Sequence, residues 1–385
     1  MKAMIFASVA SMVDLFNRDN IDILMELGYE VTVACNFKEG SVYSKEAAKQ
    51  FEKELRIMGC DTVNVPVPRH ASDIAGMIRT IQILRKDMEK KRYSIIHCQS
   101  PIGGVLARIA AYSFRKEGAK VIYFAHGFHF YTGAPEINWL IYYNIEKLCA
   151  HFTDVLLTLN REDYVRAKKH FDTDVRYIPG AGIDVLGIID CVPDIKKKRN
   201  ELNIPAGKRI IISVCELSYR KNCETMIRAF IKAGRDDAVL LMCGIGSQMD
   251  MLKELVDREG VSDKVIFAGF RDDIIELFKI SDMFMFTSRQ EGLPVALMQA
   301  MACRLPVLCS RIRGNVDLIK DSEGGYMYNC EDIDGFAEGI SRILDDTETA
   351  ARMGECNFSK ISGYDRAVVN KIMKKIYVSM GEDNE

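Results

Sequence analysis

Short apolar segments alternate with helix-compatible segments along the chain, and this alternation limits the fold more than any other feature of the sequence. It predicts parallel strands joined by right-handed helical crossovers, because parallel neighbours can be joined only through a long connection. The segments expected to form strands lie at residues 4–9, 31–35, 63–65, 95–98, 121–124 and 155–159, and then at 209–214, 238–243, 264–267, 283–286 and 306–309. The sequence therefore predicts an α/β protein with two doubly wound parallel sheets.

The break between the two runs of strands predicts where one domain ends and the next begins. A chain of 385 residues is longer than one hydrophobic core usually supports. Residues 182–198 contain Pro193 and a run of basic residues, and we expect them to form a linker. The expected domains are therefore residues 1–185 and 190–363.

The composition argues against several classes of protein. A formal net charge of −2 is unlike that of nucleic-acid-binding proteins, which are normally basic. The twelve cysteines include no Cys-x-x-Cys pair, and without a secretion signal a disulfide scaffold is not expected. No apolar run approaches the roughly 18–20 residues that cross a bilayer. We therefore expect a globular protein of the cytoplasm that binds no nucleic acid, either in solution or at the inner face of the plasma membrane.

The stretch from residue 288 to residue 319 carries the strongest local signal. The turn Glu291-Gly292-Leu293-Pro294 follows a buried strand and opens a helix that carries Gln299. A second turn, Gly314-Asn315, follows the next strand. Such turns collect free backbone N–H groups, which favour an anion such as phosphate. From spacing alone, an ordinary strand–helix unit of an α/β core is an equally good interpretation.

A second signal lies at residues 123–135, where two histidines and three aromatic residues follow a strand in a glycine-containing loop. His126 and His129 are spaced like metal ligands, but no Asp, Glu or Cys completes a ligand set, so a metal site is not predicted.

Three other segments that follow strands are compatible with either packing or binding. Gly103 and Gly104 could bring substrate close to the backbone, or could serve tight packing of a helix on a strand. Gly244-Ile-Gly246 is a weak signal for a nucleotide-binding turn. The polar residues 8–17 are expected to form a loop before a helix at residues 20–27.

Two of these motifs resemble those of a known enzyme family. Glu-Gly-Leu-Pro-x-x-x-x-Gln, entered from Phe-Thr-Ser-Arg-Gln, is similar to the Glu-x7-Glu motif of the family 4 retaining glycosyltransferases, although Gln299 stands where the second Glu is usual. Ala-His-Gly-Phe-His-Phe resembles the branch that builds bacterial exopolysaccharide and capsule. The resemblance implies the GT-B fold, in which two Rossmann-like domains face each other across a cleft. It also implies that the last helix, about residues 364–380, returns to the first, acceptor-binding domain.

The resemblance also implies roles for individual residues. His126 and Glu291 take the catalytic positions. The segment Ser-Val-Cys-Glu-Leu-Ser-Tyr-Arg-Lys-Asn at residues 213–222 resembles the family's donor-phosphate loop, in which Lys221 binds the donor diphosphate, although Cys215 and Glu216 stand where Gly and Arg are usual. Arg220 is either a second cation at the diphosphate or a member of a surface ion pair. The other donor-side residues that the resemblance implies are Gly244, Gly246, Phe270, Arg271, Gly292, Leu293, Gln299, Gly314 and Asn315. The acceptor-side residues are His129, Phe130, Tyr131, Gly103 and Gly104.

The function implied is transfer of a hexose or N-acetylhexosamine from a UDP-sugar to a lipid-linked saccharide, without a metal ion or other cofactor. The apolar helix at residues 138–147 either packs in the core or contacts the membrane that holds the acceptor. Two alternatives remain. Because Glu216 and Gln299 depart from the family pattern, the chain could be a degenerate scaffold that binds nucleotide sugars without turnover. A nucleotide-sugar epimerase would share the same fold.

Overall fold

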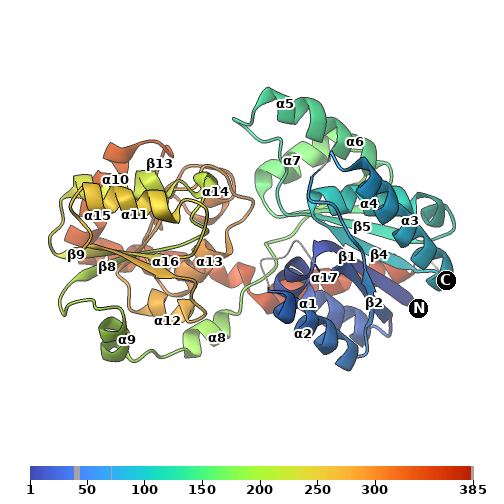
Figure 1. The fold of residues 1–385 in the computed structure, drawn as a ribbon, viewed down its shortest axis with the longest axis horizontal. Coiled ribbons are helices and arrows are strands. Elements are labelled where there is room, and N and C mark those ends of the chain that lie inside the picture. Colours follow the sequence, from blue (N-terminus) through green and yellow to red (C-terminus); the bar gives the residue numbers. More distant parts are fainter. Residues whose placement is uncertain (39–43, 71, 383–385) are drawn as a thin grey trace. The chain divides into compact units, whose positions relative to one another are not determined.

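The computed structural model describes residues 1–38, 44–70 and 72–382 and divides the chain into two compact units. Unit 1 comprises Met1–Gly182 and the chain from Ala367 onward, and unit 2 comprises Ile183–Arg366. Each unit contains one parallel sheet with helices packed on its faces (Figure 1). The alternation of strands and helices in the sequence therefore produces the predicted α/β class.

Unit 1 holds a sheet with the strand order β3-β2-β1-β4-β5-β6-β7. Its strands are β1 (Lys2–Val9), β2 (Glu30–Asn36), β3 (Asp61–Asn64), β4 (Ile95–Gln99), β5 (Lys120–Ala125), β6 (Val155–Thr158) and β7 (Asp174–Tyr177). From β1 the chain adds β2 and β3 toward one edge of the sheet. It then adds β4 on the other side of β1 and continues to the opposite edge, so the direction of winding switches between β1 and β4. In doubly wound sheets, ligands bind at the carboxyl ends of the strands beside such a switch. The four-residue edge strand β7 was not expected from the sequence, because its residues are mostly polar.

Helices cover both faces of this sheet (Figure 1). They are α1 (Ala10–Glu26), α2 (Lys45–Ile57), α3 (Ile74–Lys91), α4 (Pro101–Lys116), α5 (Glu136–Asn138), α6 (Asn144–Ala150), α7 (Arg161–His170) and α17 (Arg366–Glu382), together with a π-helical segment, η1 (Trp139–Tyr143). The final helix packs within unit 1, where the Tyr377 hydroxyl lies 2.7 Å from Nδ1 of His97.

The expected polar loop at residues 8–17 is wrong, because α1 begins directly after β1. Val9 keeps extended dihedrals, with φ −140° and ψ 154°, and the helix starts at Ala10. Ala10, Val13 and Asn17 are buried on one face of this helix, so tertiary packing overrides the polar character of the segment. The absence of a loop places Asn17 inside the protein.

A buried ion pair joins α4 to α6 in unit 1. Arg108 Nη2 lies 2.7 Å from Glu146 Oε2, with side-chain exposures of 1 % and 8 %. The guanidinium lies 3.8 Å from the centre of the Tyr123 ring, and the Tyr123 hydroxyl donates to Glu146 Oε1 at 3.0 Å. These contacts fix the helix that follows the π-helical segment.

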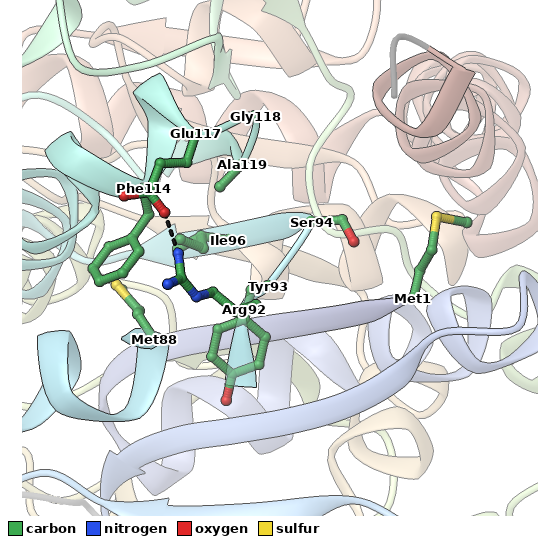
Figure 2. A pocket seen from close by; sticks show the side chains of 10 residues that line it. All are labelled: Met1, Met88, Arg92, Tyr93, Ser94, Ile96, Phe114, Glu117, Gly118 and Ala119. Atoms are coloured by element: carbon green, nitrogen blue, oxygen red, sulfur yellow. Dashed lines mark hydrogen bonds and ion pairs between the residues drawn. The ribbon is translucent and has the colours of Figure 1, made fainter. Parts of the chain in front are cut away.

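Figure 2 shows a surface pocket of unit 1 whose lining includes Met1, Ser94 and Ile96. The guanidinium of Arg92 forms an ion pair with Glu117 at its rim (Figure 2). Met1 and Ser94 precede β1 and β4, so this pocket lies at the amino ends of the strands. It is therefore at the edge of the sheet opposite to the one where doubly wound folds bind ligands.

Unit 2 holds a sheet with the strand order β10-β9-β8-β11-β12-β13. Its strands are β8 (Arg209–Val214), β9 (Ala238–Cys243), β10 (Val265–Gly269), β11 (Met283–Phe286), β12 (Val307–Ser310) and β13 (Gly325–Tyr328). The winding switches between β8 and β11. The short edge strand β13 was not expected, because it begins at a glycine, a residue that seldom marks a strand.

The helical segments of unit 2 are α8 (Val185–Asp190), α9 (Ile195–Glu201), η2 (Tyr219–Lys221), α10 (Cys223–Ala233), α11 (Met249–Arg258), α12 (Ile274–Lys279), α13 (Val295–Ala302), α14 (Asn315–Leu318), α15 (Ile333–Asp345), α16 (Thr347–Ile361) and η3 (Ser362–Tyr364). Both α8 and the start of α9 fall where a linker was expected at residues 182–198. Asp184 caps the first by accepting from Gly187 N–H at 2.8 Å, and Asp194 caps the second. These side-chain caps explain why the segment is helical despite its glycine and proline.

Candidate active site

The loops that follow β8 and β11 meet at the switch point of the unit 2 sheet and bring charged side chains together. Lys221 Nζ lies 2.5 Å from Glu291 Oε1, and Arg220 Nη1 lies 3.7 Å from Glu291 Oε2. The Glu291 side chain is 7 % exposed and that of Lys221 is 12 % exposed. The Lys221 ammonium also lies 5.0 Å from the centre of the Phe286 ring. One nearly buried carboxylate therefore faces two cations.

Backbone and side-chain hydrogen bonds hold these two loops against each other. Arg289 N–H donates to the carbonyl of Arg220 at 2.9 Å, and Arg220 Nη1 donates to the carbonyl of Gln290 at 3.2 Å. The buried Thr287 hydroxyl donates to the carbonyl of Asn222 at 2.8 Å. Neither Thr287 nor Asn222 was a candidate site residue from the sequence, yet their hydrogen bond fixes the loops that carry Lys221 and Glu291.

Glycines allow two further loops to pack against these. A Cβ added to Gly244 would lie 1.8 Å from the carbonyl oxygen of Cys215, and one on Gly246 would lie 2.2 Å from that of Leu217. Gly314, with φ +82°, would bring a Cβ to 2.4 Å from the carbonyl oxygen of Gly292. Any side chain at these positions would force the loops apart. The turns after β8, β9, β11 and β12 therefore meet as one group.

Three buried side-chain atoms beside the loops after β11 and β12 have no hydrogen-bond partner among the described residues. They are Ser288 Oγ, Ser310 Oγ and Asn315 Oδ1. Nearby, Arg313 Nε donates to the carbonyl of Glu291 at 3.0 Å and is itself buried. Unsatisfied buried polar atoms are rare in native proteins, and each calls for an explanation such as a functional role or a bound ion. Of the three residues with unsatisfied atoms, only Asn315 was a candidate from the sequence.

The remaining donor-side candidates differ in their burial and in their ion pairs. Leu293 is buried and Gly292 lies against Gly314. Phe270 follows the edge strand β10 and is 78 % exposed. Arg271 is engaged by carboxylates, with Nη2 2.6 Å from both Glu201 Oε1 and Asp273 Oδ2. Arg271 is therefore already neutralised in this structure, whereas Arg220 is held more loosely, 3.7 Å from Glu291 Oε2 and 3.9 Å from Glu216 Oε2.

Gln299 lies half-buried on α13, and its replacement tests the departure from the family pattern. Gln keeps one carbonyl acceptor for a ribose hydroxyl, whereas a carboxylate would accept about twice as strongly. We expect Gln299→Glu to bind UDP as tightly as wild type or severalfold more tightly, with turnover unchanged. Titration calorimetry with UDP measures the affinity, and Gln299→Ala, which should weaken binding, is the control. Activity that appears only in Gln299→Glu would instead identify the natural chain as a non-catalytic scaffold.

In unit 1, His126 follows β5 and lies beside the switch point between β1 and β4. Its Nε2 is 2.7 Å from Oε1 of Gln99, the last residue of β4. The rings of Phe16 and Phe124 lie 5.1 Å and 4.9 Å from the imidazole, centre to centre. Burial lowers the pKa of His126 to about 4, so the imidazole is neutral at pH 7. Neither Gln99 nor Phe16 was a candidate from the sequence.

Two of the acceptor-side predictions are corrected by the packing of α4. A Cβ on Gly104 would lie 2.3 Å from the Tyr123 ring, and one on Gly103 would lie 2.6 Å from Ser100 Oγ. The space beside these glycines is thus filled by protein side chains. Of the two interpretations left open by the sequence, the structure supports tight helix–strand packing.

The aromatic loop after His126 is partly core. Phe130 is fully buried and stacks on Phe128 with ring centres 4.6 Å apart, so it contributes to the core beneath this loop. His129 packs against Tyr142 at 4.9 Å, and the half-buried Tyr131 follows. A cavity of about 120 Å³ lies beside this loop, and its lining is almost entirely apolar. The residues that line it include Ile102, Val105, Leu106, Phe128, His129, Phe130, Tyr142 and Ile145.

Within residues 1–38, 44–70 and 72–382, no group of three or more His, Cys, Asp or Glu side chains is placed to hold a metal ion. The same described residues contain no helix that is both long and apolar enough to cross a membrane.

Comparison with known proteins gives consistent matches across both units. The model of the family "Glycosyl transferases group 1" matches residues 194–359, and that of "Glycosyl transferase 4-like domain" matches residues 18–180. EpsD of Bacillus subtilis (strain 168), which carries a glycosyltransferase name, is 32 % identical over 335 residues, covering 86 % of this chain and 84 % of that protein. The UDP-Gal:alpha-D-GlcNAc-diphosphoundecaprenol alpha-1,3-galactosyltransferase of Escherichia coli is 28 % identical over 323 residues, covering 81 % of this chain and 82 % of that enzyme.

Solved structures match the fold. The structure of Anabaena Alr3699/HepE in complex with UDP and glucose has a TM-score of 0.77 at 19 % identity, and covers 98 % of this chain and 100 % of its own. Sucrose-phosphate synthase from Thermosynechococcus elongatus has a TM-score of 0.79 at 17 % identity, and both chains are covered completely.

Proposed function

The chain belongs to the group 1 family of glycosyltransferases, and from this premise we propose that it transfers a sugar from a UDP-sugar to a lipid-linked saccharide. Its enzyme class and its GT-B fold, both predicted from the motifs, are confirmed. The proposal adds three points: the nucleotide is UDP, the anomeric configuration is retained, and the product is part of an exopolysaccharide, capsule or other bacterial glycan.

The observation that carries the donor assignment is the contact of Lys221 and Arg220 with Glu291 at the switch point of unit 2. A donor diphosphate is a stronger partner for two cations than one carboxylate. It would draw Lys221 toward itself and release the Glu291 carboxylate toward the sugar. Cations and turn amides placed where negative charge develops stabilise a leaving diphosphate. We therefore propose that Lys221 meets the leaving UDP without a metal ion. In the Anabaena relative the bound nucleotide is UDP.

The acceptor assignment is supported by an exposed apolar surface on α5, η1 and α6, which we call the apolar helix surface. Its members are Ile137, Leu140, Ile141, Tyr142, Ile145 and Leu148. Leu140 is 68 % exposed and Leu148 is 60 % exposed. Soluble monomers rarely expose contiguous apolar groups, which mark sites of contact with a membrane or a partner. The Escherichia coli relative is named for a diphosphoundecaprenol-linked N-acetylglucosamine substrate.

The function is tested by incubating the chain with UDP-glucose, UDP-galactose or UDP-N-acetylglucosamine and measuring the release of UDP. We expect release that depends on added diphosphoundecaprenol-linked N-acetylglucosamine and persists in EDTA, and a product that keeps the anomeric configuration by NMR. Release only after Mg²⁺ or Mn²⁺ is restored would contradict the metal-independent step. Isomerised nucleotide sugar without acceptor would identify an epimerase, and UDP binding without turnover of any donor would identify a scaffold.

Contact of the apolar helix surface with a membrane is tested by replacing its two most exposed leucines. We expect Leu140→Glu/Leu148→Glu to lose binding to phosphatidylglycerol vesicles by roughly tenfold or more per leucine, because burying each such side chain contributes about 1.5–3 kcal/mol. Leu186→Glu is a matched control, since Leu186 is 70 % exposed but lies on α8 of unit 2. Vesicle co-sedimentation measures the binding. Equal losses in the variant and the control would show that the surface has no specific role.

A further inference from the structure

Three buried or half-buried side chains from separate elements of unit 1 form a hydrogen-bonded chain that ends at His126. Asn17 lies on α1, Gln99 ends β4, and His126 follows β5. Asn17 is 1 % exposed and Gln99 is fully buried. Asn17 and Gln99 meet beside the switch point of the sheet.

The direction of each of these hydrogen bonds follows from the contact that Asn17, the residue farthest from His126, makes with the backbone. Asn17 Nδ2 donates to the carbonyl of Met12 at 3.3 Å, so Asn17 Oδ1 faces the opposite side. There Oδ1 accepts from Asn20 Nδ2 at 3.1 Å and from Gln99 Nε2. Turning the Asn17 amide over would set its oxygen against the carbonyl oxygen of Met12. Only this orientation of the Asn17 amide therefore gives every one of these contacts one donor and one acceptor.

The orientation of the Gln99 amide determines which ring nitrogen of His126 carries the hydrogen. With its nitrogen bonded to Asn17, Gln99 presents Oε1 to His126 Nε2 at 2.7 Å. An amide oxygen can only accept, so Nε2 must carry the hydrogen. The other ring nitrogen, Nδ1, has no hydrogen-bond partner in the described part of the chain, and the side chain is partly exposed.

We propose that Asn17 and Gln99 are positioning residues that hold His126 as the Nε2–H tautomer, so that its Nδ1 accepts a hydrogen bond from a sugar hydroxyl. The tautomer rests on the geometry of unit 1 alone, and only the sugar hydroxyl rests on the proposed function. A neutral imidazole is required, because an imidazolium has two donors and no acceptor.

The surroundings keep the imidazole neutral. Burial lowers the pKa of His126, and burial together with the neighbouring His126 lowers the pKa of His97 on β4 to about 3. The rings of Phe16 and Phe124 cover other sides of the imidazole. His126 thus donates its one N–H hydrogen to Gln99 Oε1, and its burial disfavours a second proton.

The tautomer is tested by ¹⁵N NMR of the full chain labelled at histidine and free of ligand. The chain has six histidines, and the His126 signals are assigned by their loss in His126→Asn. At pH 7 we expect a protonated Nε2 and an unprotonated Nδ1. A protonated Nδ1 in the wild type would overturn the proposal, whatever the chain transfers.

The role of the tautomer is tested with Gln99→Glu, which keeps the acceptor oxygen but adds a negative charge. The carboxylate should raise the pKa of His126, so the imidazole gains its second proton as the pH falls through that raised pKa. We expect kcat for transfer to fall at least tenfold between pH 8 and pH 6 in this variant, while the wild-type kcat stays level and UDP affinity is unchanged in both. Gln99→Met, which adds no charge, should lower kcat without adding pH dependence.

The NMR measurement and the pH profile of kcat distinguish failure of the proposed tautomer role from failure of the proposed function. A level pH profile in Gln99→Glu, with NMR showing the imidazolium, would refute the contact between Nδ1 and a hydroxyl. Absence of transfer from every donor would refute the proposed function and leave the NMR result for the tautomer standing. Circular dichroism of both variants checks that unit 1 is folded.

Discussion

Glu291→Gln will lower the turnover of sugar transfer by roughly 10²–10³-fold, the cost typical of losing one positioned electrostatic group, about 2.7–4 kcal/mol. Its affinity for UDP will stay the same or increase. Glutamine keeps an oxygen that can accept from Lys221, which lies 2.5 Å away, but it removes the charge that neutralises that lysine. A donor diphosphate then meets Lys221 without having to displace a carboxylate.

Titration calorimetry with UDP and steady-state turnover with acceptor measure the two effects separately. Glu216→Gln is the matched control, because that carboxylate is 60 % exposed and lies 3.9 Å from Arg220, and exposed ion pairs contribute little. Its turnover should remain within about twofold of wild type. Wild-type turnover in Glu291→Gln would refute the catalytic assignment. Loss of UDP binding would instead make Glu291 part of the nucleotide site.

Arg108→Met will destabilise unit 1 by about 3–5 kcal/mol, the typical cost of leaving one member of a buried ion pair without its partner. Glu146 is 8 % exposed and, among the residues that the structure describes, would keep only the Tyr123 hydroxyl as a hydrogen-bond donor. We expect the double variant Arg108→Met/Glu146→Leu to regain most of the lost stability, because it removes both charges. Full recovery is not expected, since the buried Tyr123 hydroxyl loses its acceptor, at a cost of about 1–3 kcal/mol.

Urea unfolding followed by tryptophan fluorescence measures this change, because the single tryptophan, Trp139, packs on Phe130 in unit 1. Arg92→Met is the control. Its partner Glu117 is 53 % exposed, so the pair should contribute less than about 1 kcal/mol. Similar losses in Arg108→Met and Arg92→Met would contradict the special cost of the buried pair.

Much of the fold could be predicted from the sequence because the central strands are continuous apolar runs. β4, β8, β9 and β11 begin where the sequence indicated, since both faces of a central parallel strand are buried and few polar residues interrupt them. Edge strands lack this pattern, which is why β7 and β13 were missed. The start of α1 was missed for a related reason: packing against the sheet, rather than its own residues, makes that segment helical.

The sequence by itself determined which local segments could carry chemistry. Glu291, Lys221 and His126 each follow a predicted strand in a recognisable motif, because turn and cap preferences depend on near neighbours along the chain. It also determined the family, since those motifs resemble a known one. It could not say which of these side chains touch.

Only the tertiary structure decided the contacts. Lys221 and Glu291 are 70 residues apart and meet because β8 pairs with β11 across the switch point. Gln99 reaches His126 because β4 pairs with β5, and it reaches Asn17 because α1 follows β1 on the other side of β4. The order of strands in a sheet is set by which apolar faces pack together across the whole domain. A side chain's partner in such a site is therefore a property of the assembled sheet, which no local stretch of sequence contains.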